Sequence, residues 1–280
     1  MERIDVASFE KTHEEPRGNN DKYWVDDKLI KYNDPTCPDT DVMESISSFI
    51  LMYLGIKQVN VELGYNSNSE IVEEMNLNDS NCCIIDSFLT EEGDTLVGLP
   101  SKWSKILSDD EQKNISGCFY KMFKIFSEFR DISEEDLENM KRDYVRQVLG
   151  DCIIGNEDRR LKNIGVIYNE KQGSYRLAPS FDNALAFSAF AFSGDDAYCF
   201  VGEQNFRSED IIDYIVNHYL DYISDIPEKL EELSSFGIDI VLKNYEEDIP
   251  LEKREYICAS IKENSAYINK KINDTKKMNK

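Results

Sequence analysis

Residues 155–163 of the chain read Gly-Asn-Glu-Asp-Arg-Arg-Leu-Lys-Asn, and residues 177–183 read Leu-Ala-Pro-Ser-Phe-Asp-Asn. The first segment places Asp158 and Asn163 five residues apart, and the second contributes Asp182. Hard oxygen donors suit Mg²⁺, and a nearby carboxylate suits proton transfer from a hydroxyl group. The pattern therefore predicts Asp158 as a catalytic base and Asn163 and Asp182 as metal ligands. Spacing alone leaves open that the two aspartates are cap or turn residues.

The residues between the two motifs predict how distant side chains return to one place. Ile164–Tyr168 and Tyr175–Ala178 are strand-like and flank a short turn around Gly173. A strand pair there would bring Asp182 back beside Asp158.

The N-terminal part of the chain is rich in strand-like segments. Lys22–Val25 and Lys28–Tyr32 flank residues 26–27, which predicts a β-hairpin. Val59–Leu63 and Cys82–Leu89 are predicted to be further strands.

One helix is expected within this part. Asp41 and Glu44 are three residues apart, as in a capping box, and apolar residues follow at helical spacing. Gly55 is predicted to end the helix in the left-handed conformation that glycine adopts readily.

The character of the chain changes near residues 91–94. Helical periodicity then predicts helices over 112–129, 133–149, 209–223, 228–235, 238–246 and 252–272, with a frayed basic tail from residue 270. We therefore expect an α+β chain with two lobes: residues 1–92 are strand-rich, and residues 93–280 are mainly helical. Clefts between such lobes commonly hold ligands.

Composition limits the classes of partner. The formal net charge is −23, so the surface repels phosphate backbones and anionic membranes, and neither direct nucleic-acid binding nor membrane binding is expected. Seven Cys and two His show no metal-binding spacing, which favours reduced thiols over a zinc site. The chain begins without a signal-peptide pattern, and a cytoplasmic location is expected.

Phosphoryl transfer also needs a cation near the phosphates, and Lys31 on the second hairpin strand is the predicted one. In a phosphoryl-transfer site of this kind the strand lysine pairs with a glutamate on the following helix, so Glu44 is its expected partner. Lys28 is the competing choice, and Lys31 as an ordinary surface residue stays open. The sequence has no Gly-x-Gly-x-x-Gly, so Gly18 is the residue assigned to the phosphate loop.

The segment after the last predicted N-terminal strand is a candidate purine site. Ile85, Asp86 and Phe88, with the backbone up to Leu89, would line an adenine slot. An ordinary core strand is the alternative.

In order along the chain, these segments resemble those of HipA-like serine/threonine kinases. Residues 155–163 are similar to the family loop Gly-Asn-x-Asp-Arg-His-x-x-Asn, and residues 177–183 resemble its metal-binding aspartate segment. The hairpin at 22–31, the helix at 44–56 and residues 83–93 resemble its nucleotide-lysine hairpin, following helix and hinge. The resemblance covers about residues 16–190.

This resemblance implies a bilobal protein-kinase-like fold and ATP- and Mg²⁺-dependent phosphorylation of protein Ser or Thr, with self-phosphorylation a further expectation. It gives the base role to Asp158, metal binding to Asn163 and Asp182, and ATP binding to Lys31. Arg160 replaces the family's His, which puts the geometry of the loop in question.

The resemblance also bears on partners. The chain looks like the short members that lack an extra N-terminal subdomain. A small partner or antitoxin polypeptide is therefore expected beside the protein substrate.

Two other functions remain open. Arg160 and the missing glycine loop fit a pseudokinase or regulatory binding protein. Phosphoinositide kinases share the Asp-Arg-His-x-x-Asn loop, so a lipid or small-molecule kinase is the second alternative, although the net charge of −23 argues against anionic membranes.

Overall fold

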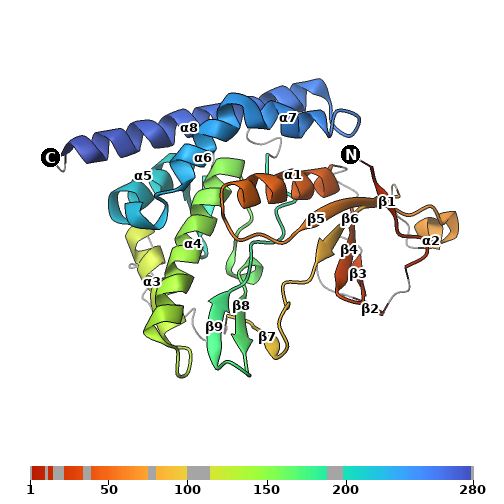
Figure 1. The fold of residues 1–280 in the computed structure, drawn as a ribbon, viewed down its shortest axis with the longest axis horizontal. Helices are drawn as coiled ribbons and strands as arrows, with labels where there is room; N and C mark the ends of the chain where they lie inside the picture. The colour runs from red at the N-terminus through yellow and green to blue at the C-terminus, as the bar shows by residue number, and fades with distance from the viewer. Residues whose placement is uncertain are drawn as a thin grey trace.

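The computed structural model describes residues 2–9, 12–14, 22–33, 39–74, 80–99, 114–187 and 198–278. Its N-terminal part is a six-stranded sheet in the order β1-β5-β6-β4-β3-β2 (Figure 1). β1 is parallel to β5, and the other neighbouring strands are antiparallel. The strands are β1 (Ile4–Asp5), β2 (His13–Glu14), β3 (Lys22–Val25), β4 (Lys28–Tyr32), β5 (Val61–Tyr65) and β6 (Asn81–Asp86).

The predicted hairpin is confirmed, with Val25 paired to Lys28 and Lys22 paired to Lys31. Asp26 turns the chain at a φ of 51°, in the left-handed region that Asp tolerates. The bounds of β5 and β6 differ from the predicted 59–63 and 82–89, because backbone groups at the predicted ends form hydrogen bonds outside these strands. The Val59 N–H donates to Ser180 O (3.1 Å), and the Ser87 N–H donates to Asp27 O (2.8 Å).

Helix α1 (Thr40–Tyr53) packs on the sheet, and its predicted capping box is wrong. The Oδ1 atom of Asn33 accepts instead from the Asp41 N–H (2.8 Å) and from Thr40 Oγ1 (2.9 Å). The Asp41 carboxylate is taken by Arg3, whose Nη1 lies 2.6 Å from Oδ2. Gly55 ends the helix at a φ of 73°, as predicted.

The C-terminal part is mainly helical. Its helices are α3 (Ile115–Ser127), α4 (Glu134–Ile154), α5 (Ser208–His218), α6 (Ile226–Glu232), α7 (Ile238–Lys243) and α8 (Leu251–Met278). The short α2 (Ser69–Glu74) lies in the N-terminal part, between β5 and β6. A π-helical turn, Leu233–Gly237, joins α6 to α7. None of the helices in the described ranges is both long and apolar enough to span a membrane.

Several helix ends differ from the sequence prediction; α5 ends at His218 and α7 at Lys243, before the predicted 223 and 246. α4 runs five residues past 149, because an apolar run continues to Ile154 before Gly155 turns at a φ of 63°. The frayed tail from residue 270 is also wrong, since α8 continues to Met278. Lys271 fixes this end of the helix, with its Nζ 2.5 Å from Asp213 Oδ2.

The strand pair between the two motifs is confirmed as β8 (Val166–Asn169) and β9 (Ser174–Leu177). A third strand that was not predicted, β7 (Asp94–Val97), pairs with β8. The sequence also missed the hairpin β10 (Tyr198–Val201) and β11 (Gln204–Arg207).

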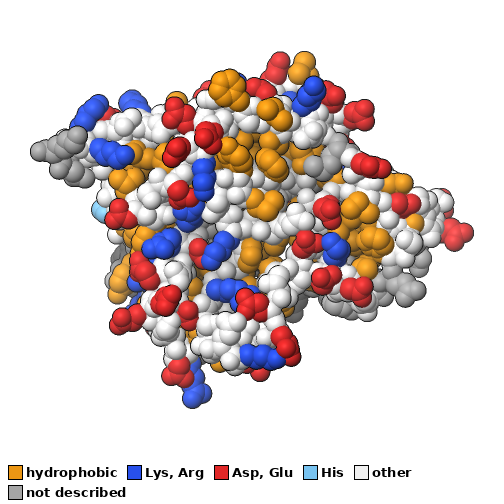
Figure 2. All heavy atoms as spheres, viewed as in Figure 1, with side chains coloured by type: hydrophobic (Ala, Val, Ile, Leu, Met, Phe, Trp, Pro, Cys, Tyr) orange, Lys and Arg blue, Asp and Glu red, His pale blue; other side chains and the backbone are white. Residues whose placement is uncertain are grey.

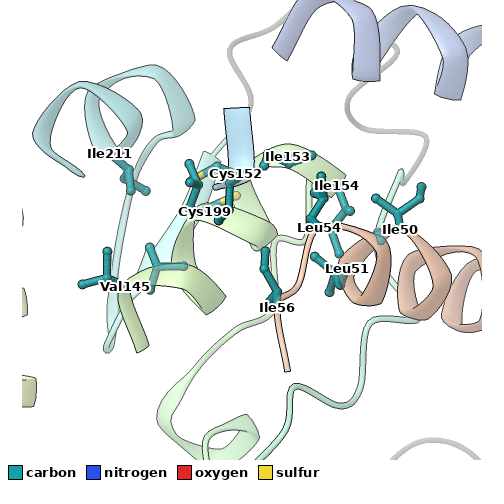
Figure 3. Packing of buried hydrophobic residues seen from close by; sticks show 14 of the residues in the cluster. Ile50, Leu51, Leu54, Ile56, Val145, Cys152, Ile153, Ile154, Cys199 and Ile211 are labelled. Carbon is teal, nitrogen blue, oxygen red and sulfur yellow. The ribbon is translucent and has the colours of Figure 1, made fainter. Parts of the chain in front are cut away.

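One apolar cluster joins the end of α1 to α4 and on to the later helices. Figure 3 shows Leu51, Leu54 and Ile56 from the first part close to Ile154 of α4. Gly150 makes this approach feasible: a Cβ there would lie 2.7 Å from Leu51 Cδ2 and 2.9 Å from Ile56 Cδ1. The two parts of the chain therefore share a close-packed core.

Gly150→Ala should destabilise the protein by about 1–2 kcal/mol. Overpacking a buried contact costs about 1–3 kcal/mol, and the better helix propensity of Ala returns up to about 1 kcal/mol. Urea unfolding measures the change. Gly98→Ala is the control, because nothing lies within 4 Å of its added Cβ; equal stability of both variants would contradict the packing account.

Candidate active site

Lys31 of β4 contacts two carboxylates from other segments. Its Nζ lies 3.2 Å from Glu44 Oε2 on α1 and 2.6 Å from Asp182 Oδ1. Lys31 and Glu44 are buried, whereas the Asp182 side chain is 41% exposed. The predicted Lys31–Glu44 contact is therefore present. The competing Lys28 pairs with Asp86 instead, at 2.7 Å.

The charges of this cluster stabilise one another. Burial alone would favour the neutral amine, but Glu44 and Asp182 raise the pKa of Lys31 above its ordinary value. Burial also opposes ionisation of Asp182, yet Lys31 lowers the pKa of that carboxyl group. At neutral pH the site therefore holds a fixed ammonium beside a partly exposed carboxylate.

Asp158 and Asn163 lie together in the loop after α4. The loop closes with a 3₁₀ turn, Leu161–Asn163. The Asn163 Nδ2 donates to the Asp158 carbonyl oxygen (2.7 Å) and lies 3.4 Å from Oδ2 of the same residue. The Asp158 side chain is 25% exposed, so a hydroxyl group of another molecule can reach its carboxylate.

Two cations flank the Asp158 carboxylate. Arg160 Nε lies 3.3 Å from Oδ1, and Lys162 Nζ lies 3.2 Å from Oδ2. Both cations are exposed, and the Arg160 guanidinium lies over the ring of Phe200 at 4.8 Å. The Arg160 N–H donates to Asp158 O (2.8 Å) and its carbonyl accepts from Asn163 (2.8 Å), so Arg160 is part of a closed loop.

Arg159 is the most constrained residue of the site, because its large charged side chain is fully buried. Its Nε lies 3.0 Å from Asp151 Oδ2, and its Nη2 lies 3.1 Å from Asp151 Oδ1. Nη2 also donates to Ser180 Oγ (2.6 Å) and to Asn183 Oδ1. Every bond of this guanidinium is made inside the protein.

The same guanidinium connects the two predicted metal segments. Arg159 Nη1 donates to the carbonyl of Asn163 (3.2 Å) and to the carbonyl of Phe181, which precedes Asp182. Asp182 has a φ of 61°, a left-handed conformation uncommon outside glycine, held between these contacts and Lys31.

A chain of hydrogen bonds extends from this segment back to α1. The Asn183 N–H donates to Glu44 Oε1 (2.7 Å), and Asn183 Nδ2 donates to Gln58 Oε1 (3.1 Å). Glu44 thus binds Lys31 with one oxygen and the backbone beside Asp182 with the other. The structure therefore brings Lys31, Glu44 and Asp182 into one cluster.

The predicted adenine residues lie at the end of β6. The Phe88 ring stacks on Phe181, with centroids 5.5 Å apart and an interplanar angle of 20°. The Asp86 carboxylate accepts from Lys28 and from Asn60, and its N–H donates to Asn60 O. Phe88 therefore borders the metal segment, whereas Asp86 fixes strand ends. Gly18, assigned to the phosphate loop, lies outside the described residues.

Sequence reasoning missed the residues that hold the loop together. The sequence did contain a sign of the buried role of Asp151, because this residue is a lone charge within the apolar run from Val148 to Ile154. Such a charge needs a buried partner, and Arg159 is the nearby cation of the motif. The role of Asn183 depends on contacts with Arg159, Glu44 and Gln58, which are all distant in sequence, so it carries no comparable local signal.

The donor set fits Mg²⁺. Asp182 and Asn163 offer a carboxylate and an amide, which are oxygen ligands that this ion prefers. Within the described part of the chain, no hydrogen bond is donated to Asn163 Oδ1. The Lys31 ammonium beside Asp182 adds the positive charge that phosphate groups require.

Comparisons with known proteins place this arrangement in a fold class. A scan against protein-family models and a search of curated proteins found no match to the sequence. Among solved structures, the Helicobacter pylori proinflammatory kinase CtkA superposes with a TM-score of 0.71 at 14% identity, covering 98% of this chain and 99% of CtkA.

A second similar structure is HipA of Shewanella oneidensis, solved with HipB and operator DNA. It has a TM-score of 0.58 and 12% identity, and the match covers 96% of this chain and 67% of HipA. At these identities the likeness establishes the fold. The chain therefore has the bilobal, kinase-like α+β fold of CtkA and HipA, as the sequence resemblance predicted.

Arg159→Lys should lower the free energy of unfolding by about 1–3 kcal/mol, because the charge is kept but buried acceptors of the guanidinium lose their donor. A lysine cannot reproduce the fork-shaped contacts of the guanidinium with Asp151 and the two carbonyl groups. Urea unfolding provides the measurement. Arg130→Ala is the matched control, since its side chain is 93% exposed and its loss should change stability by less than about 0.5 kcal/mol. A similarly small effect for Arg159→Lys would contradict the account.

Proposed function

We propose that this chain is an ATP- and Mg²⁺-dependent kinase that transfers the γ-phosphoryl group to Ser or Thr of a protein. The observation that carries the proposal is the Lys31 ammonium, which lies between buried Glu44 and partly exposed Asp182. A buried cation beside an accessible carboxylate is the arrangement that kinase folds use to position phosphates and metal. The comparisons with CtkA and HipA support the same class of activity at the level of fold.

Each residue of the site receives a role in this proposal. Lys31 binds the α- and β-phosphates, and Glu44 orients Lys31. Asp158 orients the acceptor hydroxyl and takes its proton, while Arg160 and Lys162 offset negative charge beside it. Phe88 and Phe181, which are stacked on one another, form an apolar wall for the purine.

Asn163 and Asp182 would hold Mg²⁺, which when bound neutralises charge on the phosphate oxygens. The protein's own contribution is positional, since Arg159 fixes the backbone of both ligand segments. Such positioning supplies much of the catalysis in a reaction with a loose, anionic transition state.

The proposal also covers the division of the chain and its partners. Residues 1–92 would be the nucleotide lobe and residues 93–280 the catalytic lobe. A partner polypeptide is proposed beside the protein substrate, because the similar HipA structure was solved with HipB. In this proposal Asp86 does not contact the nucleotide but supports the purine wall, because its carboxylate binds Lys28 and Asn60 beside it.

Asp158→Asn should lower the rate of phosphoryl transfer by about 10²–10⁴-fold, the usual contribution of a general base. Labelled ATP with the intact chain and a cell extract measures transfer, and phosphopeptide mapping identifies the acceptor. Asp131→Asn is the control, because Asp131 is an exposed aspartate whose ion-pair partner among the described residues is its neighbour Arg130. Chelation of Mg²⁺ should abolish the signal.

Three outcomes would contradict this assignment. Unchanged labelling by Asp158→Asn would remove the base role. Binding of ATP without any transfer would favour a pseudokinase. Labelling of inositol lipids in preference to protein would favour a lipid kinase.

Arg160→His should keep transfer within about threefold of the wild type, because the exposed Arg160 side chain is not needed to close the loop; its backbone does that. Arg160→Glu should lower kcat/KM by about tenfold or more, since it places a like charge beside Asp158 and the phosphates. Initial rates at fixed ATP measure both variants. Loss of activity in Arg160→His equal to that in Arg160→Glu would show that the guanidinium itself is required.

A further inference from the structure

An apolar groove lies on the helical part of the molecule, between the end of α1 and the π-helical turn before α7. Its volume is about 530 Å³, and its apolar lining comes from Tyr53, Phe236 and Ile240. Phe236 is 80% exposed and Ile240 is 68% exposed. Figure 2 shows hydrophobic side chains gathered over the region of α1 and α7, among acidic ones. Side chains of this kind are normally covered, so the groove marks an interaction surface.

The apolar surface continues along α1. Phe49 and Met52 are each 42% exposed and lie four and one residues before Tyr53. Residues three and four apart share one face of a helix, so these side chains extend the groove as a stripe. The π-helical turn, Leu233–Gly237, supplies Phe236, which lines the groove together with Tyr53, and such turns frequently occur at functional sites.

The side chains that line the groove carry negative charge, which favours a positively charged partner. Glu228, Glu231 and Glu232 line it, and none of its lining residues is Lys or Arg. The Tyr53 hydroxyl donates to Glu232 Oε2 (3.0 Å), and among the described residues none of the three glutamates forms an ion pair. By contrast, the neighbouring groove between α7 and α8 is lined by both Lys243 and Glu246, and so has mixed charge.

We propose that this groove binds a basic amphipathic helix of a partner protein, with apolar side chains at helical spacing and Lys or Arg on the flanks. The apolar stripe supplies the contact area, and the three glutamates supply charge complementarity. The proposal does not depend on phosphoryl transfer. A partner bound to α1 would nevertheless be coupled to the candidate active site, because α1 also carries the buried Glu44 that binds Lys31.

A synthetic helical peptide with Leu at positions i, i+4 and i+7 and Lys on the remaining face is the probe, labelled for fluorescence polarisation. Its twin carries Glu in place of Lys. The intact chain should bind the Lys peptide but not the Glu peptide, and binding should weaken with added salt. The double variant Phe236→Ser/Ile240→Ser should weaken binding by at least about tenfold, because it removes the two most exposed apolar side chains that line the groove.

The triple variant Glu228→Gln/Glu231→Gln/Glu232→Gln should lose most of the salt dependence. Leu251→Ser is the matched control: it is 59% exposed in the mixed-charge groove and should bind the peptide as the wild type does. Thermal unfolding verifies that each variant is folded.

No binding, equal binding of both peptides, or unchanged binding by the double variant would overturn the proposal. Self-association of the wild-type chain that the double variant abolishes, measured by light scattering, would also overturn it. That result would assign the face to a second copy of this chain.

Discussion

The ion pair between Arg159 and Asp151 is the interaction on which the site depends. Both side chains are fully buried, so each would carry a large desolvation penalty without the other. The pair is satisfied because Asn156 donates to Asp151 Oδ1 at 3.0 Å and the remaining guanidinium N–H groups reach Ser180 and two backbone carbonyls. A network with every member paired in a low dielectric is rigid, and a rigid frame can hold catalytic groups in fixed positions.

This frame explains how segments far apart in sequence meet. Gln58 and Ser180 form a parallel bridge, and the Ser180 N–H donates to Lys57 O at 2.8 Å, so the chain after α1 pairs with the segment before Asp182. Glu44 then joins α1 to both Lys31 and Asn183. The sheet, α1 and the loop after α4 are therefore positioned by polar contacts at the site and by the apolar core beneath it.

The sequence predicted the elements with strong local patterns. The hairpin around residues 26–27, the strand pair between the motifs and the end of α1 at Gly55 follow from turn chemistry and periodicity, and the structure confirms them. The contact of Lys31 with Glu44 was also predicted, from the kinase pattern in which a strand lysine pairs with a glutamate on the following helix, and the structure confirms it. The roles of the site residues stay predictions that the transfer assays address.

The remainder required the tertiary structure. The cap of α1 comes from Asn33, seven residues before Thr40, because Asp41 is taken by Arg3 from the start of the chain. The hairpin of β10 and β11 was not predicted from the sequence. The buried network of Arg159 was missed because its partners Ser180 and Asn183 lie more than twenty residues away in the sequence. The lone charge of Asp151 in an apolar run was nevertheless a usable signal.

The most direct test of the central claim is calorimetric titration of the intact chain with a nonhydrolysable ATP analogue, with and without Mg²⁺. A site built on Lys31, Asn163 and Asp182 predicts binding that requires Mg²⁺ and that Asp182→Asn weakens by at least about tenfold. The absence of binding, or binding that is independent of both Mg²⁺ and Asp182, would contradict the account.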